Sequence, residues 1–259
     1  MTLCIVWREG ENIKFCSDSR ISFPNVTSDF GIKIVRMPFR IFGPNDESGN
    51  QELIATGDLG LCFAGSAIGA LMTKDALSEL VSNLQAVPNH HDIGMDGIAD
   101  FVKRAFEVIS KEVSQALFER GQTKIVFAGY CAKHKRHRAF AMKRDAKNDF
   151  QFDEILKLPT DHLFFGSGSK EAKLLEDTKH MTDKEAMEIL QAVIDDPAVK
   201  GVGGNIQYGR FNGKQFQPYG VTKLGDSVHY WRGPLDLNGP DFDQAYGLIP
   251  KFPLLDLID

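Results

Sequence analysis

The second residue of the chain, Thr2, carries a hydroxyl that could act as a nucleophile. We expect Met1 to be removed, because aminopeptidases cleave an initiator Met that is followed by a small residue. Thr2 would then have a free α-amino group, whose ordinary pKa of about 7.7–8.0 leaves part of it neutral near pH 7. Such an amine can serve as the base for the hydroxyl of the same residue. The alternative is that Thr2 is an ordinary residue of a first strand.

A carboxylate is predicted to lie beside Thr2. Residues 2–7 and 13–16 are rich in β-branched and aromatic side chains, and the loop between them indicates a β-hairpin. With Gly10 at the centre of the turn, Thr2 is opposite Asp18, and Cys4 is opposite Cys16. Directly opposed residues in antiparallel strands have Cβ atoms roughly 4.5–5.5 Å apart, so Asp18 would reach the amine and the hydroxyl. A register shift of one residue would destroy this arrangement.

Length and composition are those of a globular protein with a full hydrophobic core. The chain has 259 residues, of which 42% are apolar and 25% charged, and no Pro/Ser/Gly-rich linker divides it. A net charge of −5 gives no reason to expect nucleic acid or an anionic membrane as a partner. The basic run from Lys133 to Arg138 lies between two strand-like segments and is interpreted as a solvated hairpin turn.

The absence of a signal-peptide pattern and the usage of cysteine and histidine indicate a cytoplasmic protein without a structural metal site. No signal-peptide pattern or membrane-length apolar run is present. The four cysteines lie in apolar strand-like segments without a CxxC pair, which predicts buried thiols in a reducing compartment. The histidines lack metal-ligand spacing.

The elements that must position these residues follow a regular order. Apolar spacing predicts strands at 33–42, 60–63, 124–132, 138–142 and 150–157, helices at 68–84, 95–118, 169–177 and 182–194, and late strands at 204–211, 214–219 and 226–231. Thr182-Asp183-Lys184-Glu185 is a capping box, and Asn212-Gly213 is a hairpin signal. This order predicts an α+β fold, a four-layer αββα sandwich of two antiparallel sheets flanked by helices. We expect one domain over residues 1–232 and an irregular Pro-rich extension over 233–259.

Four segments match one known family in order and in approximate spacing. They are Thr2 followed by Ser17-Asp18-Ser19-Arg20, then Gly31-Ile32-Lys33-Ile34, Phe63-Ala64-Gly65-Ser66-Ala67, and Phe165-Gly166-Ser167-Gly168-Ser169. In these segments the chain resembles proteasome β-subunits and bacterial proteasome-related peptidases, which are N-terminal-nucleophile (Ntn) hydrolases. The resemblance runs from Thr2 to about Phe211 and implies the Ntn hydrolase fold.

The resemblance also implies a role for each matched residue. Thr2 would be the nucleophile, and Lys33, which lies one residue short of the usual spacing, would help to deprotonate it beside Asp18. The backbone N–H of Gly65 would form the oxyanion hole, and Ser167 would hydrogen-bond the N-terminal amine. Ser19, Arg20 and Gly168 would support these groups.

The chain departs from the family pattern at two places. Gly69 stands where the family often has Asp. Near Gly203, Val199 and Val202 stand where the family has an Asp and a Ser around the amine. Asp195 or Asp196, a few residues upstream, would replace them if the loop were rearranged.

The function implied by the resemblance is that of a threonine-type peptide or amide hydrolase. It would act without a cofactor on peptides or proteins, within a homo-oligomeric ring or open spiral, and an unfoldase partner is undefined. One alternative is an Ntn amidase that acts on a small molecule with the same residues. The other is a catalytically inactive protein that uses the fold as a scaffold or binding module. Retention of Met1 would favour inactivity, because a blocked amine cannot act as a base.

Overall fold

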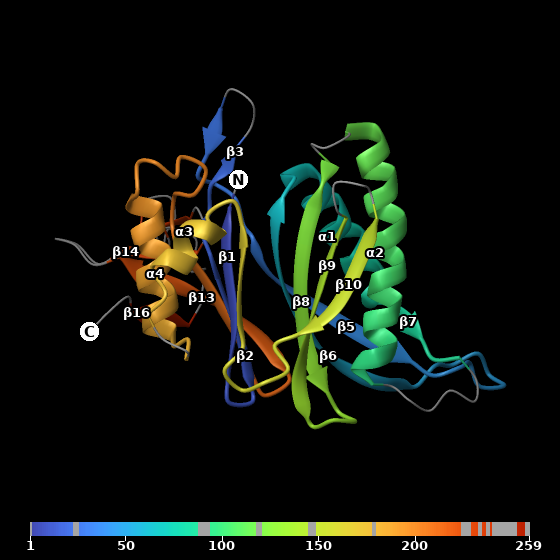
Figure 1. Cartoon of the computed structure of the whole chain (residues 1–259). Helices are drawn as coiled ribbons and strands as arrows, with labels where there is room; N and C mark the ends of the chain where they lie inside the picture. The colour runs from blue at the N-terminus through green and yellow to red at the C-terminus, as the bar shows by residue number, and fades with distance from the viewer. Residues whose placement is uncertain are drawn as a thin grey trace.

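The chain folds into four layers, with two packed sheets between two layers of helices (Figure 1). This arrangement is the αββα sandwich that the order of elements predicts. The structure is a computed structural model, and it describes residues 2–22, 26–87, 94–117, 121–144, 149–177, 180–223, 229–232, 235–236, 239 and 253–256.

Among the described residues, the first sheet has eight strands, in the order β11-β1-β2-β12-β13-β14-β15 with β16 beside β13. Their bounds are β1 Leu3–Glu9, β2 Asn12–Ser17, β11 His162–Gly166, β12 Gln207–Asn212, β13 Gln215–Lys223, β14 His229–Arg232, β15 Leu235–Asp236 and β16 Leu254–Asp256. All of these pairings are antiparallel except that of β16 with β13, which is parallel. Within the extension predicted as irregular, β15 and β16 are therefore short strands of this sheet, while the division at residue 232 stays a prediction.

In the part of the chain that the structure describes, the second sheet has six strands, in the order β10-β9-β8-β6-β5-β7. Their bounds are β5 Ile34–Phe42, β6 Leu53–Gly65, β7 Leu84–Gln85, β8 Thr123–Cys131, β9 Arg136–Arg144 and β10 Phe150–Ile155, and a separate pair is formed by β3 Ile21–Ser22 and β4 Thr27–Ser28. The short β7 runs parallel to β5, and the other pairings are antiparallel. The basic run begins in the turn between β8 and β9, where residues 133–135 are exposed as predicted. The interpretation as a solvated turn is wrong for His137 and Arg138, because these two residues lie in β9 and are buried.

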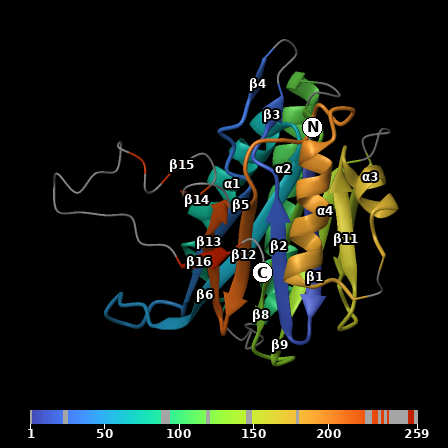
Figure 2. The ribbon, with the colours of Figure 1, turned by 90° about the vertical axis from the view of Figure 1, so that its left-hand side faces the viewer.

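The described helices cover the outer faces of the two sheets (Figures 1 and 2). The six-stranded sheet packs against α1 (Ala67–Val81) and α2 (Met95–Leu117), and the eight-stranded sheet packs against α3 (Ser169–Leu174) and α4 (Asp183–Asp195). The predicted capping box is confirmed, because the Thr182 side chain accepts from the Glu185 backbone and the Glu185 side chain accepts from the Thr182 backbone. None of the described helices is long and apolar enough to cross a bilayer.

Alternation of side chains along the central strands connects the layers. In β1, Leu3, Ile5 and Trp7 pack in the core under α3 and α4, whereas Cys4 and Val6 pack in the core between the sheets. Successive strand residues point to opposite faces, so a strand that is buried on both faces needs an unbroken apolar run. The alternation directs Thr2, two residues before Cys4, toward the space between the sheets. All four cysteines are buried and free, as predicted.

The register of the first hairpin differs from the prediction by one residue. Cys4 pairs with Ser17 and Ile5 pairs with Cys16, so the turn has two central residues, Gly10 and Glu11, instead of being centred on Gly10. Gly10 has a φ of +60°, which fits the first central position of a type II′ turn. The prediction that Thr2 is directly opposite Asp18 is therefore wrong. Asp18 lies beyond the end of β2, where its backbone N–H donates to the Leu3 carbonyl at 3.3 Å.

Candidate active site

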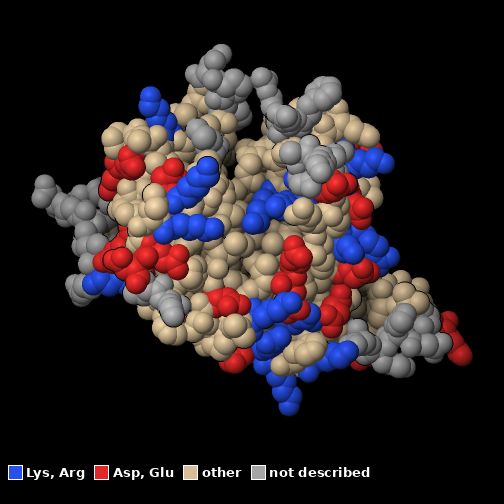
Figure 3. Space-filling view, in the orientation of Figure 1, with Lys and Arg blue, Asp and Glu red and all other residues tan. Residues whose placement is uncertain are grey.

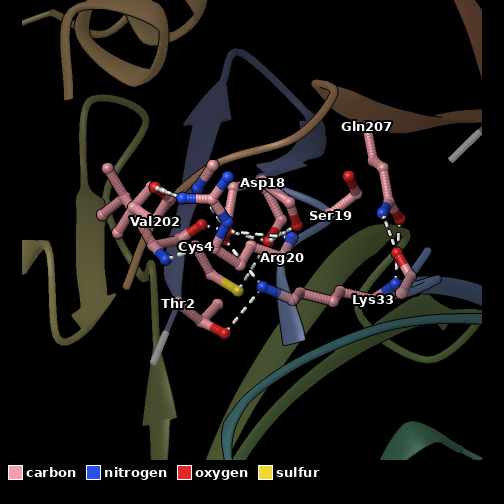
Figure 4. Close-up of polar contacts among 12 residues, drawn as sticks. Thr2, Cys4, Asp18, Ser19, Arg20, Lys33, Val202 and Gln207 are labelled. Atoms are coloured by element: carbon pink, nitrogen blue, oxygen red, sulfur yellow. Dashed lines mark hydrogen bonds and ion pairs between the residues drawn. The ribbon is translucent and has the colours of Figure 1, made fainter. Parts of the chain in front are cut away.

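A hydroxyl, an ammonium group and a carboxylate meet in a row at the start of β1 (Figure 4). Lys33 Nζ lies 2.7 Å from Thr2 Oγ1 and 2.8 Å from Asp18 Oδ1. The side chains of Lys33 and Asp18 are 1% and 0% exposed, and Thr2 is also buried. The structure thus brings together three of the predicted residues, although by a route other than the predicted register.

Asp18 is held by backbone donors on both of its carboxylate oxygens. Oδ1 accepts from the Leu3 N–H at 3.0 Å, and Oδ2 accepts from the N–H groups of Gly203 at 3.0 Å and Arg20 at 3.2 Å. Burial raises the pKa of Asp18, and the opposing attraction of Lys33 and of the backbone donors does not cancel this effect. The carboxylate is therefore fixed in orientation and aims one oxygen at Lys33.

A buried glutamine that the sequence analysis missed positions the backbone of Lys33. Oε1 of Gln207, in β12, accepts from the N–H groups of Lys33 at 2.8 Å and Ile34 at 3.2 Å. Its Nε2 donates to the carbonyl of Gly31. Gln207 is 1% exposed. The only available signal was an amide residue between Ile206 and Tyr208 in a predicted strand, and this pattern does not reveal a partner 174 residues away.

Ser167 lies against the backbone of Thr2, and its bond to a free N-terminal amine stays a prediction. The Thr2 N–H donates to Ser167 Oγ at 3.0 Å, and the N–H of Gly168 donates to the Thr2 carbonyl at 3.3 Å. The turn requires glycine at position 166, because φ is +103° there and a Cβ would lie 2.1 Å from the Thr2 carbonyl oxygen. The Gly-Ser-Gly segment is thus a close backbone contact to the residue that bears the hydroxyl.

Gly65 lies at the end of β6, on the sheet opposite Thr2. Cys4 Sγ donates to the carbonyl of Phe63 at 3.2 Å, which ties this end of β6 to β1. Gly65 is exposed and has a φ of +101°, and a Cβ there would lie 2.5 Å from the carbonyl oxygen of Gln122. None of the hydrogen bonds found among the described residues joins Gly65 to Thr2, so its assignment to an oxyanion hole stays a prediction.

Ser19 and Arg20 follow Asp18 and bind Asp29 and the loop around Gly203. The Arg20 guanidinium makes two bonds to Asp29, at 2.7 and 3.0 Å, and its Nη1 also reaches the Val202 carbonyl at 3.4 Å. Ser19 Oγ donates to the Asp29 carbonyl and accepts from the N–H of Asn205 at 2.8 Å. These bonds position the loop whose Gly203 donates to Asp18.

Neither Asp195 nor Asp196 takes the place of the missing Asp and Ser. The Asp195 carboxylate accepts from Gln191 within α4, and Asp196 Oδ1 accepts from the N–H of Ala198. Val202 is buried in the core under α4 instead of contributing a polar group. The replacement suggested by the sequence is therefore wrong, and the backbone of Gly203 supplies the contact from this loop.

The arrangement offers nucleophilic chemistry without metal ligands. Among the described residues, no group of three or more His, Cys, Asp or Glu side chains could hold a metal ion. A hydroxyl within hydrogen-bond distance of a lysine nitrogen, which a carboxylate in turn orients, has the geometry in which a nucleophile can be activated.

Comparisons with known proteins identify the fold. No protein-family model matches the sequence, and no curated protein matches it. Among solved structures, Anbu (ancestral beta-subunit) from Yersinia bercovieri is similar, with a TM-score of 0.58 and 15% identity over 84% of this chain and 86% of that one. The helical assembly of the Anbu complex from Pseudomonas aeruginosa gives a TM-score of 0.56 and 14% identity over 87% and 88% of the two chains.

An Anbu mutant from Hyphomicrobium sp. strain MC1 is similar to the same degree, with a TM-score of 0.56 and 15% identity over 84% of this chain and 87% of that one. The three similarities extend over most of each chain, and their identities are low. They show that this chain has the proteasome-like αββα fold.

Proposed function

We propose that the chain is a threonine-type peptide or amide hydrolase whose nucleophile is the hydroxyl of Thr2. The observation that carries this proposal is the contact of 2.7 Å between Thr2 Oγ1 and the buried Nζ of Lys33. The proposal requires cleavage of the Met1–Thr2 bond, which frees the α-amine. Residues 1–232 would form the hydrolase domain, with 233–259 as an extension of it.

The α-amine of Thr2 is the group that accepts the proton of the Thr2 hydroxyl. The neutral α-amine of Thr2 takes the proton as Oγ1 attacks the substrate carbonyl carbon. The Lys33 ammonium group stabilises the developing negative charge on Oγ1, and the contact with Asp18 at 2.8 Å holds this ammonium group in place. Ser167, at 3.0 Å from the Thr2 nitrogen, orients the amine.

The tetrahedral intermediate then collapses to an ester between Thr2 and the acyl group of the substrate. The amine returns the proton to the leaving nitrogen, and the C–N bond breaks. The backbone N–H of Gly65 stabilises the oxyanion in this proposal. A water molecule hydrolyses the ester by the reverse sequence, which restores the Thr2 hydroxyl.

Assembly into a homo-oligomer is part of the proposal. One of the similar structures is a helical assembly of the Anbu complex, and this chain shares its fold over 87% of its length. An assembly of this type would restrict access to the site and favour peptides or unfolded proteins as substrates.

A digest of an unfolded protein tests the proposal. Purified full-length protein is incubated with casein, and the products are identified by mass spectrometry. We expect new peptides with the unaltered protein, residual cleavage with Thr2→Ser, which keeps a hydroxyl and an amine, and none with Thr2→Ala. Equal cleavage by Thr2→Ala, or no cleavage by protein with a free Thr2 amine, would overturn the proposal.

A further inference from the structure

Lysine side chains gather beside the Thr2 site without carboxylate partners. Lys124 of β8 is directly opposite Lys143 of β9. Like charges in this position destabilise an antiparallel pair. Figure 3 shows Lys and Arg side chains on both sides of the hollow between the two halves of the molecule, over α3 on one side and over β8 and β9 on the other. On the α3 side, Lys173 is exposed and its charge acts on Lys124.

Alternation places Lys124 and Lys143 on the face that looks toward Thr2. Val126 in β8 and Ala141 in β9 pack in the core between the sheets, and each lysine lies two residues from one of them. Residues two positions apart in a strand point to the same face of the sheet, so both lysines project into the space between the sheets.

The contacts of Lys124 place its ammonium group beside the Thr2 site. Its Nζ lies 5.0 Å from the ring centroid of Phe165, the residue just before the turn that holds the Thr2 backbone. Lys124 is also paired with Ala64, which precedes Gly65. The ammonium group therefore lies between the two segments that flank Thr2, one from each sheet.

The charges of these lysines are not balanced by the described part of the chain. None of Lys124, Lys143 and Lys173 has a described carboxylate within ion-pair distance. On the other side of β9, Lys143 is opposite Gln151 of β10. Asp153, on the same face of β10, is opposite Ala141 and makes no ion pair with either lysine. Burial and the Lys143 charge lower the pKa of Lys124, as expected for a cation that lacks a counter-charge.

We propose that the site recognises substrates by a carboxylate, which Lys124 and Lys143 bind beside the scissile bond. The inference rests on the proposed function and adds a substrate class to it. A bound carboxylate would relieve the repulsion between the two lysines, and partial burial strengthens the attraction relative to open water. The carboxylate can belong to an Asp or Glu side chain or to the C-terminus of a peptide.

Binding to an inactive protein tests this inference independently of turnover. Fluorescein-labelled Ala-Ala-Glu-Glu-Ala-Ala amide, its Gln-Gln analogue as the amide, and the same analogue with a free C-terminus are titrated with full-length Thr2→Ala protein, and anisotropy is recorded. We expect the Glu peptide to bind about tenfold more tightly than the Gln amide at low salt, with the difference shrinking as salt screens the charges. Tighter binding of the analogue with the free C-terminus would identify the terminal carboxylate as the group recognised.

Two double variants in the Thr2→Ala background separate local recognition from net charge. Lys124→Gln with Lys143→Gln removes the paired lysines, and we expect the preference for carboxylate to be lost. Lys74→Gln with Lys111→Gln removes the same charge from the outer helices α1 and α2 and should leave the preference unchanged. Equal affinity for all three peptides, or a preference that survives in the Lys124/Lys143 variant, would overturn the inference.

The two proposals fail in different ways. Cleavage of casein without selectivity for acidic segments, together with equal peptide affinities, would remove the carboxylate inference and leave the hydrolase intact. Carboxylate binding that depends on Lys124 and Lys143, together with a Thr2 that never reacts, would support the inference and remove the hydrolase.

Discussion

Two ion-pair networks in this molecule differ in what their cation contacts. Lys33 bonds to one carboxylate, that of Asp18, and to the hydroxyl of Thr2. Arg138 bonds to two carboxylates, making a two-pronged contact to Glu154 at 2.8 and 2.7 Å and a further bond to Asp96. The Lys33–Asp18 pair is fully buried, whereas the side chains of Arg138, Glu154 and Asp96 are 10%, 22% and 51% exposed.

The difference shows which network contributes stability. Arg138 lowers the pKa of both of its carboxylates, so the paired state favours the charged groups. At Asp18, burial raises the pKa although Lys33 is adjacent. A buried pair of this kind recovers little beyond its desolvation cost. We infer that the Lys33 network is maintained for chemistry on Thr2, and that the Arg138 network fastens β9 to β10 and α2.

The largest expected effect comes from removing the cation beside Thr2. Lys33→Met should reduce turnover by about a thousandfold, because Thr2 loses the group that stabilises its developing charge. It should also lower the free energy of unfolding by about 3 kcal/mol, since a buried carboxylate is left without its partner. Hydrolysis rates and urea denaturation measure the two effects.

A paired variant separates these two consequences. Lys33→Met with Asp18→Asn carries no buried charge, and we expect it to recover stability but not activity. Normal turnover in Lys33→Met would show that Lys33 takes no part in the reaction. The proposed difference in role between Lys33 and Arg138 would then be wrong.

The next largest effect is expected at the turn that contacts the Thr2 backbone. A methyl group in Gly166→Ala would clash with the Thr2 carbonyl, and its left-handed φ adds strain. Displacement of Thr2 should lower turnover by about a hundredfold. Gly10→Ala is the matched control, because Gly10 also has a positive φ but has open space around it. This control should lose about 1–2 kcal/mol of stability and no activity per folded molecule; an equal loss of turnover in both variants would contradict the interpretation.

Removing Arg138, the cation of the second network, should change the free energy of unfolding and leave turnover unchanged. Arg138→Met is expected to lower the free energy of unfolding by about 1–2 kcal/mol at pH 7, after allowance for the exposure of Asp96, with unchanged turnover. Because the folded pKa values of Asp96 and Glu154 are lowered, this stability is present above their ordinary range of about 3.9–4.3. It is lost as pH falls through the lowered values, so the variant and the unaltered protein should converge at low pH. A difference in stability that is independent of pH would argue against the ionic origin.

The smallest effect is expected at the N-cap of α4, which belongs to neither of the two ion-pair networks. Thr182→Ala removes the capping box of α4 and should cost about 1 kcal/mol. Thermal denaturation measures this loss, and Thr182→Ser is the control that keeps the hydroxyl. Turnover should be unaffected, and a loss of activity greater than the loss of folded protein would show that α4 contributes to the site.

The sequence indicated much of the fold because its signals are local. Apolar spacing placed the helices to within a few residues, and the capping box at Thr182 was correct to the residue. Strand β6 was predicted only over 60–63 but runs from Leu53 to Gly65. Its first residues include the apolar Leu53 and Ile54, but these side chains are exposed, and Gly57 and Asp58 separate them from the buried apolar run that gave the signal. The predicted hairpin register was wrong by one residue. A turn with two central residues and a turn centred on Gly10 differ by a single residue, and the uniform apolar run of the strands does not distinguish between them.

Candidate site residues were predictable where order along the chain matched a known pattern. Thr2, Asp18, Lys33 and Ser167 fall in that class, and the structure brings them together. Gln207 escaped detection because its role depends on long-range packing that places β12 beside β2. Asp29 also escaped, since a carboxylate in a short loop is ordinarily a solvated charge, whereas here it binds Arg20.

Intact-mass analysis of the purified protein, before and after treatment with a peptide epoxyketone, tests the central claim most directly. This reagent needs both the amine and the hydroxyl of an N-terminal threonine for its two bonds. The account predicts that Met1 is absent, that one adduct forms per chain on Thr2, and that Thr2→Ala forms none. A native protein that retains Met1 and forms no adduct would contradict it.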